Sequence, residues 1–303
     1  MNQPNLKEND VTSADVLTSG VDLDLVRRLE DKAAHIRKQI AMCAHKMGTT
    51  IHLGGPLSAV DVVVALYYEY LGFDPENLKD PDRNKFVLSK GHNGVLLYNI
   101  LADLGLYNWD EVFEGYNRPG HPFGMHPNRQ HIKGIEASTG SLGHGLSLAA
   151  GMAVANRADG RTSRIYVMTG DGEMEEGSNW EALMYAGSHK LGNLVNILDF
   201  NHSTGAYRYG DNMVVDWANA YTSFGWDVLE INGNDMEEVV GALGSLPPVD
   251  WAHESRPVAI ISNTIKGYGI DFMNGPKWHL GAIDDEKLAL AVASIDRTRK
   301  VRN

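Results

Sequence analysis

The sequence predicts an α/β protein with a doubly wound, mainly parallel sheet and helices on both of its faces. Short apolar runs typical of buried strands alternate along the chain with longer segments of helical periodicity. Two such runs, 164–169 and 194–198, flank a helical pattern at 178–186, and a strand–helix–strand unit of this kind pairs its strands in parallel. Polar residues follow both runs directly, and sheets of this class bind ligands beyond the carboxyl ends of their strands.

Composition limits the classes of protein to which the chain can belong. Its 303 residues suffice for one large domain, and a hydrophobic fraction of 43% supports a full core. The net charge of −12 argues against a broad nucleic-acid-binding surface. Cys43 is the only cysteine, so no disulfide can form within the chain, and with no secretory signal or membrane-spanning run apparent we expect a cytoplasmic protein. Residues 1–20 are polar and aperiodic and predict a mobile tail, and residues 21–303 predict a single domain.

Capping residues and apolar periodicity place the elements along the chain. Asp22, Ser58 and Asp235 are the expected N-caps of three helices. The predicted helices are 22–46, 59–71, 95–104, 146–153, 178–186, 219–224, 235–243 and 285–297. The predicted strands are 86–89, 164–169, 194–198, 226–231 and 257–264.

Several histidines lie in loops between these elements. His52 lies in a glycine-rich loop between the first two helices, and His92 lies between a strand and the start of a helix, where free N–H groups favour an anion. A single histidine is more often a surface or core-edge residue than a catalyst, so neither position decides a function alone. The long irregular segment 107–139 is either functional or disordered, and a metal cluster of its histidines is disfavoured by their wide spacing.

Glycine-rich turns mark two places where a ligand can approach the backbone. The segment 139–145, TGSLGHG, enters a helix of small residues and favours close approach of a flat ring or a phosphate, or simply tight helix packing. Asp171 lies between two glycines at the end of one predicted strand, and Asn201 follows the next strand. A carboxylate, an amide oxygen and a backbone carbonyl, which Ser203 can offer, are hard ligands that suit Mg²⁺ or Ca²⁺. A Gly-Asp-Gly turn also occurs after strands without any ligand, so the distal Asn201 carries much of this interpretation.

Assembled in order, these motifs resemble the amino-terminal, thiamine diphosphate-binding half of the transketolase family. The resemblance covers about residues 22–290. It depends on six motifs in order: IHLGGPLS, FVLSKGH, PGHP, TGSLGHG, GDGEMEEG with its downstream Asn201, and TIKGYG followed by KWH. It implies transfer of a two-carbon ketol unit from a ketose, expected to be a phosphate, to an aldose, with thiamine diphosphate and Mg²⁺ or Ca²⁺.

The resemblance also implies roles for individual residues. The implied metal ligands are Asp171, Asn201 and the carbonyl of Ser203. The implied contacts of the cofactor are His92, Gly172, Asn201 and His279 around the diphosphate, Gly140, Ser141 and Leu142 along the rings, and Glu176 at a subunit interface nearby. The implied histidines on the substrate side, which assist proton transfer, are His52, His121 and His279.

The chain departs from the family pattern in two ways. Leu53, Ser141 and His144 stand where the family commonly has Pro, Pro and Gln, and these changes bear on substrate preference without removing a metal ligand. More importantly, full-length transketolases are more than twice as long, and the absent half carries the pyrimidine-binding domain. We therefore expect a second, carboxy-terminal polypeptide to supply that half in an α2β2 heterotetramer.

Two other functions remain open from the sequence. The first alternative is the α subunit of a 2-oxo acid dehydrogenase, although TGSLGHG and KWH fit the transketolase pattern better. The second is a non-catalytic subunit that retains the fold, although every metal and diphosphate position holds a residue of a type that can bind these groups.

Overall fold

A five-stranded sheet in the order β2–β3–β4–β8–β7 forms the centre of the computed structural model, which describes residues 17–211, 213–253 and 255–299. All of its strand pairs are parallel, so the predicted α/β class with a parallel sheet is confirmed. The strands of this sheet are β2 (Lys85–Leu88), β3 (Ile165–Gly170), β4 (Leu194–Phe200), β7 (Asp227–Asn232) and β8 (Val258–Asn263). Four two-residue strands form small antiparallel pairs outside it: β1 (Ile51–His52) with β9 (Leu280–Gly281), and β5 (Ser203–Thr204) with β6 (Tyr207–Arg208).

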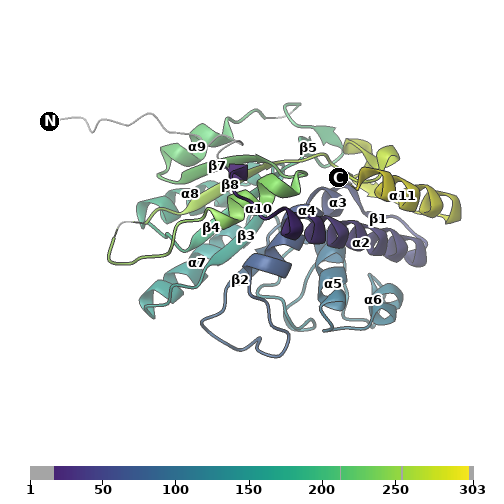
Figure 1. Ribbon diagram of the computed structural model, residues 1–303, viewed down its shortest axis with the longest axis horizontal. Helices are drawn as coiled ribbons and strands as arrows, with labels where there is room; N and C mark the ends of the chain where they lie inside the picture. Colours follow the sequence, from purple (N-terminus) through teal and green to yellow (C-terminus); the bar gives the residue numbers. More distant parts are fainter. Residues whose placement is uncertain (1–16, 212, 254, 300–303) are drawn as a thin grey trace.

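Helices cover both faces of this sheet (Figure 1). On one face lie α7 (Gly145–Ala158), α8 (Gly177–Ser188) and α9 (Trp217–Ser223). The other face carries α2 (Leu23–Met47), α3 (Gly54–Ser58), α4 (Val60–Ala65) with its π-helical continuation η1 (Leu66–Tyr70), α5 (Gly94–Asp103), α6 (Trp109–Gly115), α10 (Met236–Gly244) and α11 (Asp285–Thr298). Short 3₁₀ turns complete the loops: η2 (Gly91–Asn93), η3 (Glu173–Glu175), η4 (Asp271–Met273) and η5 (Pro276–Trp278).

The alternation of side chains along the strands explains why the fold has two cores. In β3, Ile165 and Val167 belong to the core under α7 and α8, whereas Tyr166 and Met168 point to the larger core under α2, α4 and α10. Successive side chains of a strand point to opposite faces, so a strand that is buried on both faces is apolar throughout. This is why the sequence runs of β3, β4 and β8 predicted buried strands correctly.

Two of the three predicted caps are confirmed. The side chains of Asp22 and Asp235 accept hydrogen bonds from backbone amides at the starts of α2 and α10. The prediction for Ser58 is wrong, because a helical turn already begins at Gly54 and Ser58 is its last residue. Its hydroxyl instead contacts the Gly55 carbonyl and the Asp199 carboxylate in the interior. Of the predicted tail 1–20, residues 1–16 lie outside the described residues, and Leu17 is buried.

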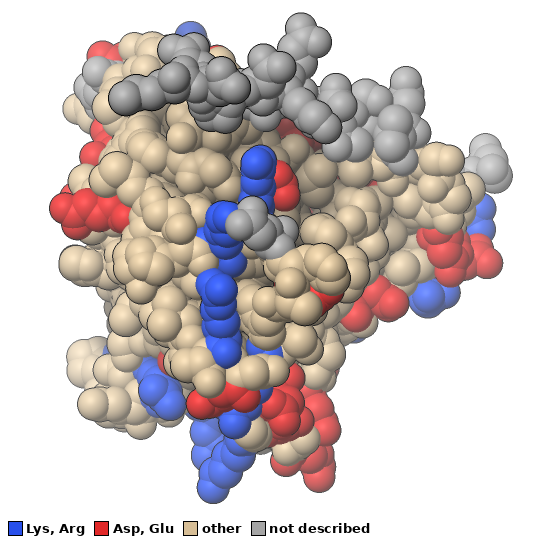
Figure 2. Space-filling model, turned by 90° about the vertical axis from the view of Figure 1, so that its left-hand side faces the viewer, with Lys and Arg blue, Asp and Glu red and all other residues tan. Residues whose placement is uncertain are grey.

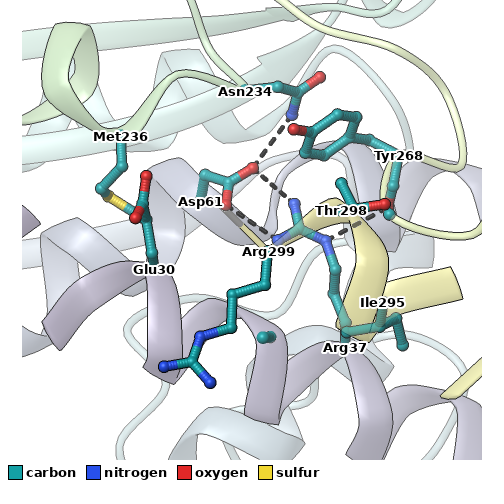
Figure 3. A pocket seen from close by; sticks show the side chains of 11 residues that line it. Glu30, Arg37, Asp61, Asn234, Met236, Tyr268, Ile295, Thr298 and Arg299 are labelled. Atoms are coloured by element: carbon teal, nitrogen blue, oxygen red, sulfur yellow. Dashed lines mark hydrogen bonds and ion pairs between the residues drawn. The ribbon is translucent and has the colours of Figure 1, made fainter. Parts of the chain in front are cut away.

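A buried ion pair ties the helical layer to the loops at the carboxyl ends of β7 and β8 (Figure 3). Arg37 of α2 donates from Nη1 and Nη2 to Asp61 of α4 at 2.9 and 2.5 Å, and from Nε to the Tyr268 carbonyl at 3.2 Å. Asn234 donates to Asp61 at 3.1 Å and to the Ser58 carbonyl at 3.2 Å. A buried charge is tolerated only when it is paired and hydrogen-bonded, and both side chains here meet that requirement.

On the face that lies to the left in Figure 1, lysine and arginine side chains form a row down the middle of the view, with acidic side chains beside them (Figure 2). Basic residues at the amino ends of the strands have partners within the chain. Arg256 pairs with Asp227, and Lys85 donates to two backbone carbonyls of the preceding turn. Among the described helices, none combines the length and the apolar character that a bilayer span requires.

Candidate active site

Strands β2, β3, β4 and β8 end at one cavity of about 280 Å³. The loop before α3, the start of the β5–β6 hairpin and the end of η5 complete its wall. Nine of the residues that the sequence singles out line it: His52, His92, Gly140, Leu142, Asp171, Gly172, Asn201, Ser203 and His279. The carboxyl ends of a parallel sheet therefore gather these residues, as expected for a ligand site of this class.

Asp171 is fixed at the end of β3 by backbone amides. Its two carboxylate oxygens accept from Gly172 N at 2.9 Å and from Ser203 N at 3.0 Å, which joins the end of β3 to the β5–β6 hairpin. Burial and the neighbouring charge of Asp199 raise the pKa of Asp171 to about 6, while the two amide hydrogen bonds and the charge of Lys90 oppose this rise. A buried carboxylate of this kind is stabilised by a cation placed against it.

Asn201 leaves its amide oxygen without a partner. Its Nδ2 atom lies 3.2 Å from the carboxylate of Asp199 and 3.5 Å from the Ser58 hydroxyl. Its Oδ1 atom is buried and has no hydrogen-bond partner among the described residues. An orphaned buried acceptor normally costs about 1–3 kcal/mol, so this oxygen fits the place of a metal ligand. Asn201, Asp171 and Ser203 line the same cavity and together match the hard-ligand set that Mg²⁺ or Ca²⁺ takes.

A second buried ion pair adjoins this cavity, which Lys90 lines. Lys90, which follows β2, pairs with Asp199 of β4, and both side chains are almost completely buried. Burial alone would raise the pKa of the Asp199 carboxyl, but the Lys90 charge and hydrogen bonds from Lys90, Thr264 and Ser58 lower it overall. Asp199 is therefore a carboxylate at neutral pH.

Three histidines form a cluster on one wall of the cavity. The ring of His52 lies 5.0 Å from that of His92 and 4.9 Å from that of His279, centroid to centroid, and the other two rings are 5.7 Å apart. Burial, together with the positive charges of His126 and Lys266, lowers the pKa of His52 to about 4, and burial with Lys266 lowers that of His279 similarly. These rings are neutral near pH 7 and can accept a proton. The Nδ1 atoms of His52 and His279 are buried without a partner in the described part of the chain.

His126 lines the cavity and His121 does not. The sequence contains two His-Pro pairs five residues apart, and the resemblance assigned a substrate-side role to the first through the PGHP motif. His121 is exposed beside Gly115 and does not line the cavity, whereas His126 lies at its mouth. A Cβ atom on Gly140 would meet the His126 ring at 2.7 Å, so the absence of a side chain at position 140 makes room for that ring. Sequence spacing could not choose between the two pairs because the loop that carries both is irregular.

Ser141 and Glu176 also lie outside the cavity. Both are exposed, so this chain alone does not bring them to the candidate site. Glu176 packs its Cβ close to Gly143, at the entrance to α7. Its predicted place at a subunit interface remains a prediction.

Other lining residues did not emerge from the sequence as site residues. Glu173 is buried and accepts from the Ser89 hydroxyl and from the amides of Gly143 and Gly170, so it joins the ends of β2 and β3 to the glycine-rich segment. Lys266 donates to the Gly205 carbonyl at 2.7 Å, and burial lowers its pKa to about 8. Their position is the signal that could have identified Glu173 and Lys266 from the sequence, since each of them follows a β strand within a few residues.

Comparison with known proteins agrees with this geometry. The profile described as "Transketolase, thiamine diphosphate binding domain" matches residues 29–295. The chain belongs to the transketolase family. It is 37% identical over 269 residues to an apulose-4-phosphate transketolase subunit of Actinobacillus succinogenes, covering 88% of this chain and 95% of that one. It is 36% identical over 271 residues to "6-deoxy-6-sulfo-D-fructose transketolase subunit SqwG" of Clostridium sp., covering 89% and 96%.

Solved transketolases share the fold but are longer. The crystal structure of the Campylobacter jejuni transketolase superposes with a TM-score of 0.81 at 28% identity, covering 91% of this chain and 43% of that one. The chain thus corresponds to less than half of that transketolase and to almost the whole of relatives named as subunits. The family assignment made from the six motifs is confirmed.

Proposed function

We propose that this chain is the thiamine diphosphate-binding subunit of a two-chain transketolase that transfers a two-carbon ketol unit from a ketose phosphate to an aldose. The observation that carries the proposal is that the buried amide oxygen of Asn201 has no partner among the described residues and that Asn201 lines the same cavity as Asp171, at the carboxyl ends of β3 and β4. Family membership says which cofactor such a site serves. Asp171, Asn201 and the Ser203 carbonyl would hold Mg²⁺ or Ca²⁺, and the cation would hold the diphosphate.

The cofactor, when bound, supplies the electron sink for breaking a carbon–carbon bond next to a carbonyl. The chain's own residues bind, orient and move protons. Gly172, His92 and His279 would surround the diphosphate, and Gly140 and Leu142 would contact the rings.

The neutral histidines of the cavity wall would carry out proton transfer. His52 and His279, with their lowered pKa values, would accept a proton from a substrate hydroxyl and return it. His126, at the mouth, replaces His121 in the proposed substrate-side set. Lys266 carries positive charge at neutral pH and adds to the attraction for an anionic ligand.

The proposal includes a carboxy-terminal partner that supplies a pyrimidine-binding domain in an α2β2 assembly. The relatives named as subunits are matched along 95% and 96% of their length, whereas a full transketolase is matched along 43%. Apolar side chains are also exposed next to the cavity: Tyr207 is 66% exposed, Ile265 49% and Leu280 46%. Exposed apolar groups around a site favour coverage by another chain. The cytoplasmic location stays a prediction from the single cysteine.

Reconstitution tests this function. The purified chain and a carboxy-terminal transketolase subunit from the same organism would be assayed separately and mixed, with thiamine diphosphate and Mg²⁺, against ketose phosphates and 2-oxo acids. We expect ketol transfer only from the mixture, and gel filtration should give two copies of each chain. Full activity of the single chain would refute the two-chain proposal, and turnover of 2-oxo acids alone would refute the transketolase assignment.

A further inference from the structure

Asp199 is the centre of a hydrogen-bond network that touches the metal-ligand set without joining it. Its Oδ2 atom accepts from Lys90 Nζ, from the Ser58 hydroxyl at 2.7 Å and from Asn201 Nδ2 at 3.2 Å. Its Oδ1 atom accepts from the Thr264 hydroxyl at 2.5 Å. Asp199 does not line the cavity, so we do not place it among the residues that would contact the cofactor or substrate.

An ionised carboxylate can only accept hydrogen bonds. The end of the Asn201 amide that faces Asp199 must therefore be the NH₂ group, and the oxygen must face the other way. That oxygen is the buried Oδ1 atom, which has no partner in the part of the chain that the structure describes. The two ends of an amide have nearly the same shape, so packing alone does not distinguish them, whereas the charge of Asp199 does.

We propose that Asp199 is a positioning residue that holds the Asn201 amide with its oxygen toward the divalent cation. This inference rests on the proposed function, because it assigns a determinant to the same metal site. A flipped amide would present N–H donors to the cation and could not ligate it. Partners of this kind, which orient a ligand without touching the metal, typically contribute about 10–100-fold to metal affinity.

The network also explains why Asp199 itself cannot turn. Lys90 reaches it from the end of β2, Ser58 from the end of α3 and Thr264 from beyond β8. Ser58 is held in turn by Asn234, which donates to its backbone carbonyl. Three separate segments thus fix the carboxylate, and the carboxylate fixes the ligand two residues further along the same strand end.

The test compares Asp199→Leu with Thr264→Val. Asparagine at position 199 would not serve, because Lys90 and Ser58 would keep its amide oxygen at the Oδ2 position, where it still accepts from Asn201. Leucine has nearly the shape of the aspartate side chain but no acceptor, which permits the amide of Asn201 to flip. The second variant, Thr264→Val, removes one hydrogen bond from the same buried carboxylate and leaves its contact with Asn201 in place. Mn²⁺ binding would be titrated by electron paramagnetic resonance in the presence of thiamine diphosphate and the second polypeptide. Thermal unfolding without metal would measure stability separately.

We expect Asp199→Leu to weaken Mn²⁺ binding about 10-fold or more and Thr264→Val to leave it close to wild type, even if both lower the unfolding temperature. A role in stability alone would instead lower the unfolding temperature of both variants and leave Mn²⁺ binding unchanged in both. Unchanged binding in Asp199→Leu, with wild type binding normally, would overturn the positioning role and leave the proposed function intact. Absence of Mn²⁺ binding by the wild-type pair would overturn both.

A double variant covers the case in which Asp199→Leu does not fold. In Asp199→Leu with Lys90→Met, apolar side chains of similar size replace the buried ion pair, an exchange that is often neutral for stability and that keeps the net charge near the cavity unchanged. We expect the double variant to fold and to bind Mn²⁺ about 10-fold or more weakly than wild type, because no acceptor holds the amide of Asn201. A folded double variant that binds Mn²⁺ as tightly as wild type would contradict the inference.

Discussion

Replacement of Arg37 by methionine tests how much the buried ion pair of Figure 3 contributes to the fold. Arg37 and Asp61 are each 5% exposed, and their two hydrogen bonds measure 2.9 and 2.5 Å. Without the guanidinium, the Asp61 carboxylate keeps Asn234 as its only remaining hydrogen-bond donor among the described residues. Removing one partner from a buried pair typically costs about 3–5 kcal/mol, because the other charge stays buried without compensation. We therefore expect Arg37→Met to lower the free energy of unfolding by about 3–5 kcal/mol.

Urea denaturation of the purified chain, followed by circular dichroism, measures this change at constant m-value. The double variant Arg37→Met with Asp61→Asn removes the unpaired charge and should recover part of the lost stability. The exposed pair Arg27–Asp24 provides the control, since Arg27→Met should cost less than about 1 kcal/mol. A loss for Arg37→Met no larger than that for Arg27→Met would refute the reasoning, because it would mean that the buried carboxylate finds another partner or water.

Three further outcomes follow from the site. His126→Ala should reduce kcat of the reconstituted enzyme about 10²-fold or more, whereas His121→Ala should stay near wild type, and equal effects would contradict the choice of His126. His52 and His279 have pKa values lowered to about 4, below the value of about 6.5 in an unfolded chain. The contribution of these two histidines to stability should therefore be complete above about pH 6.5 and fall as the pH drops toward 4, because the unfolded chain takes up the protons first. A double variant with glutamine at both positions should lose less stability than wild type between pH 7 and pH 5, as measured by urea denaturation. A Cβ atom on Gly91 would lie 2.6 Å from a backbone nitrogen of the glycine-rich segment, so Gly91→Ala should cost about 1–3 kcal/mol and weaken binding of thiamine diphosphate, as measured by calorimetry with the second polypeptide present.

Strands and caps were predictable because their causes are local or periodic. The runs of β3, β4 and β8 are apolar throughout since both of their faces are buried, and that pattern is visible in one dimension. The prediction that Ser58 caps a helix was wrong. Ser58 lies in the sequence where a cap would lie, but its hydroxyl donates a hydrogen bond to the buried carboxylate of Asp199 instead. That partner is 141 positions away and leaves no local signal.

The motif residues at the strand ends were predictable for a similar reason, since a parallel sheet brings the carboxyl ends of its strands to one edge. Asp171 and Asn201 needed only this rule and the chemistry of their oxygens. His121 illustrates the limit, because the PGHP motif alone assigned it to the site, whereas His126 of the same irregular loop lines the cavity. The direction of such a loop depends on packing, here against Gly140, which sequence spacing does not encode.

The sequence by itself determined the class of fold, the family and the donor atoms available for a cation, because these depend on residue type, period and order along the chain. Only the tertiary structure decided which histidine reaches the cavity and which way the amide of Asn201 points. Both depend on contacts between segments far apart in sequence, such as Lys90 and Asp199. The physical reason is that a buried charge constrains every polar group around it, and which groups surround it is known only once the chain is folded.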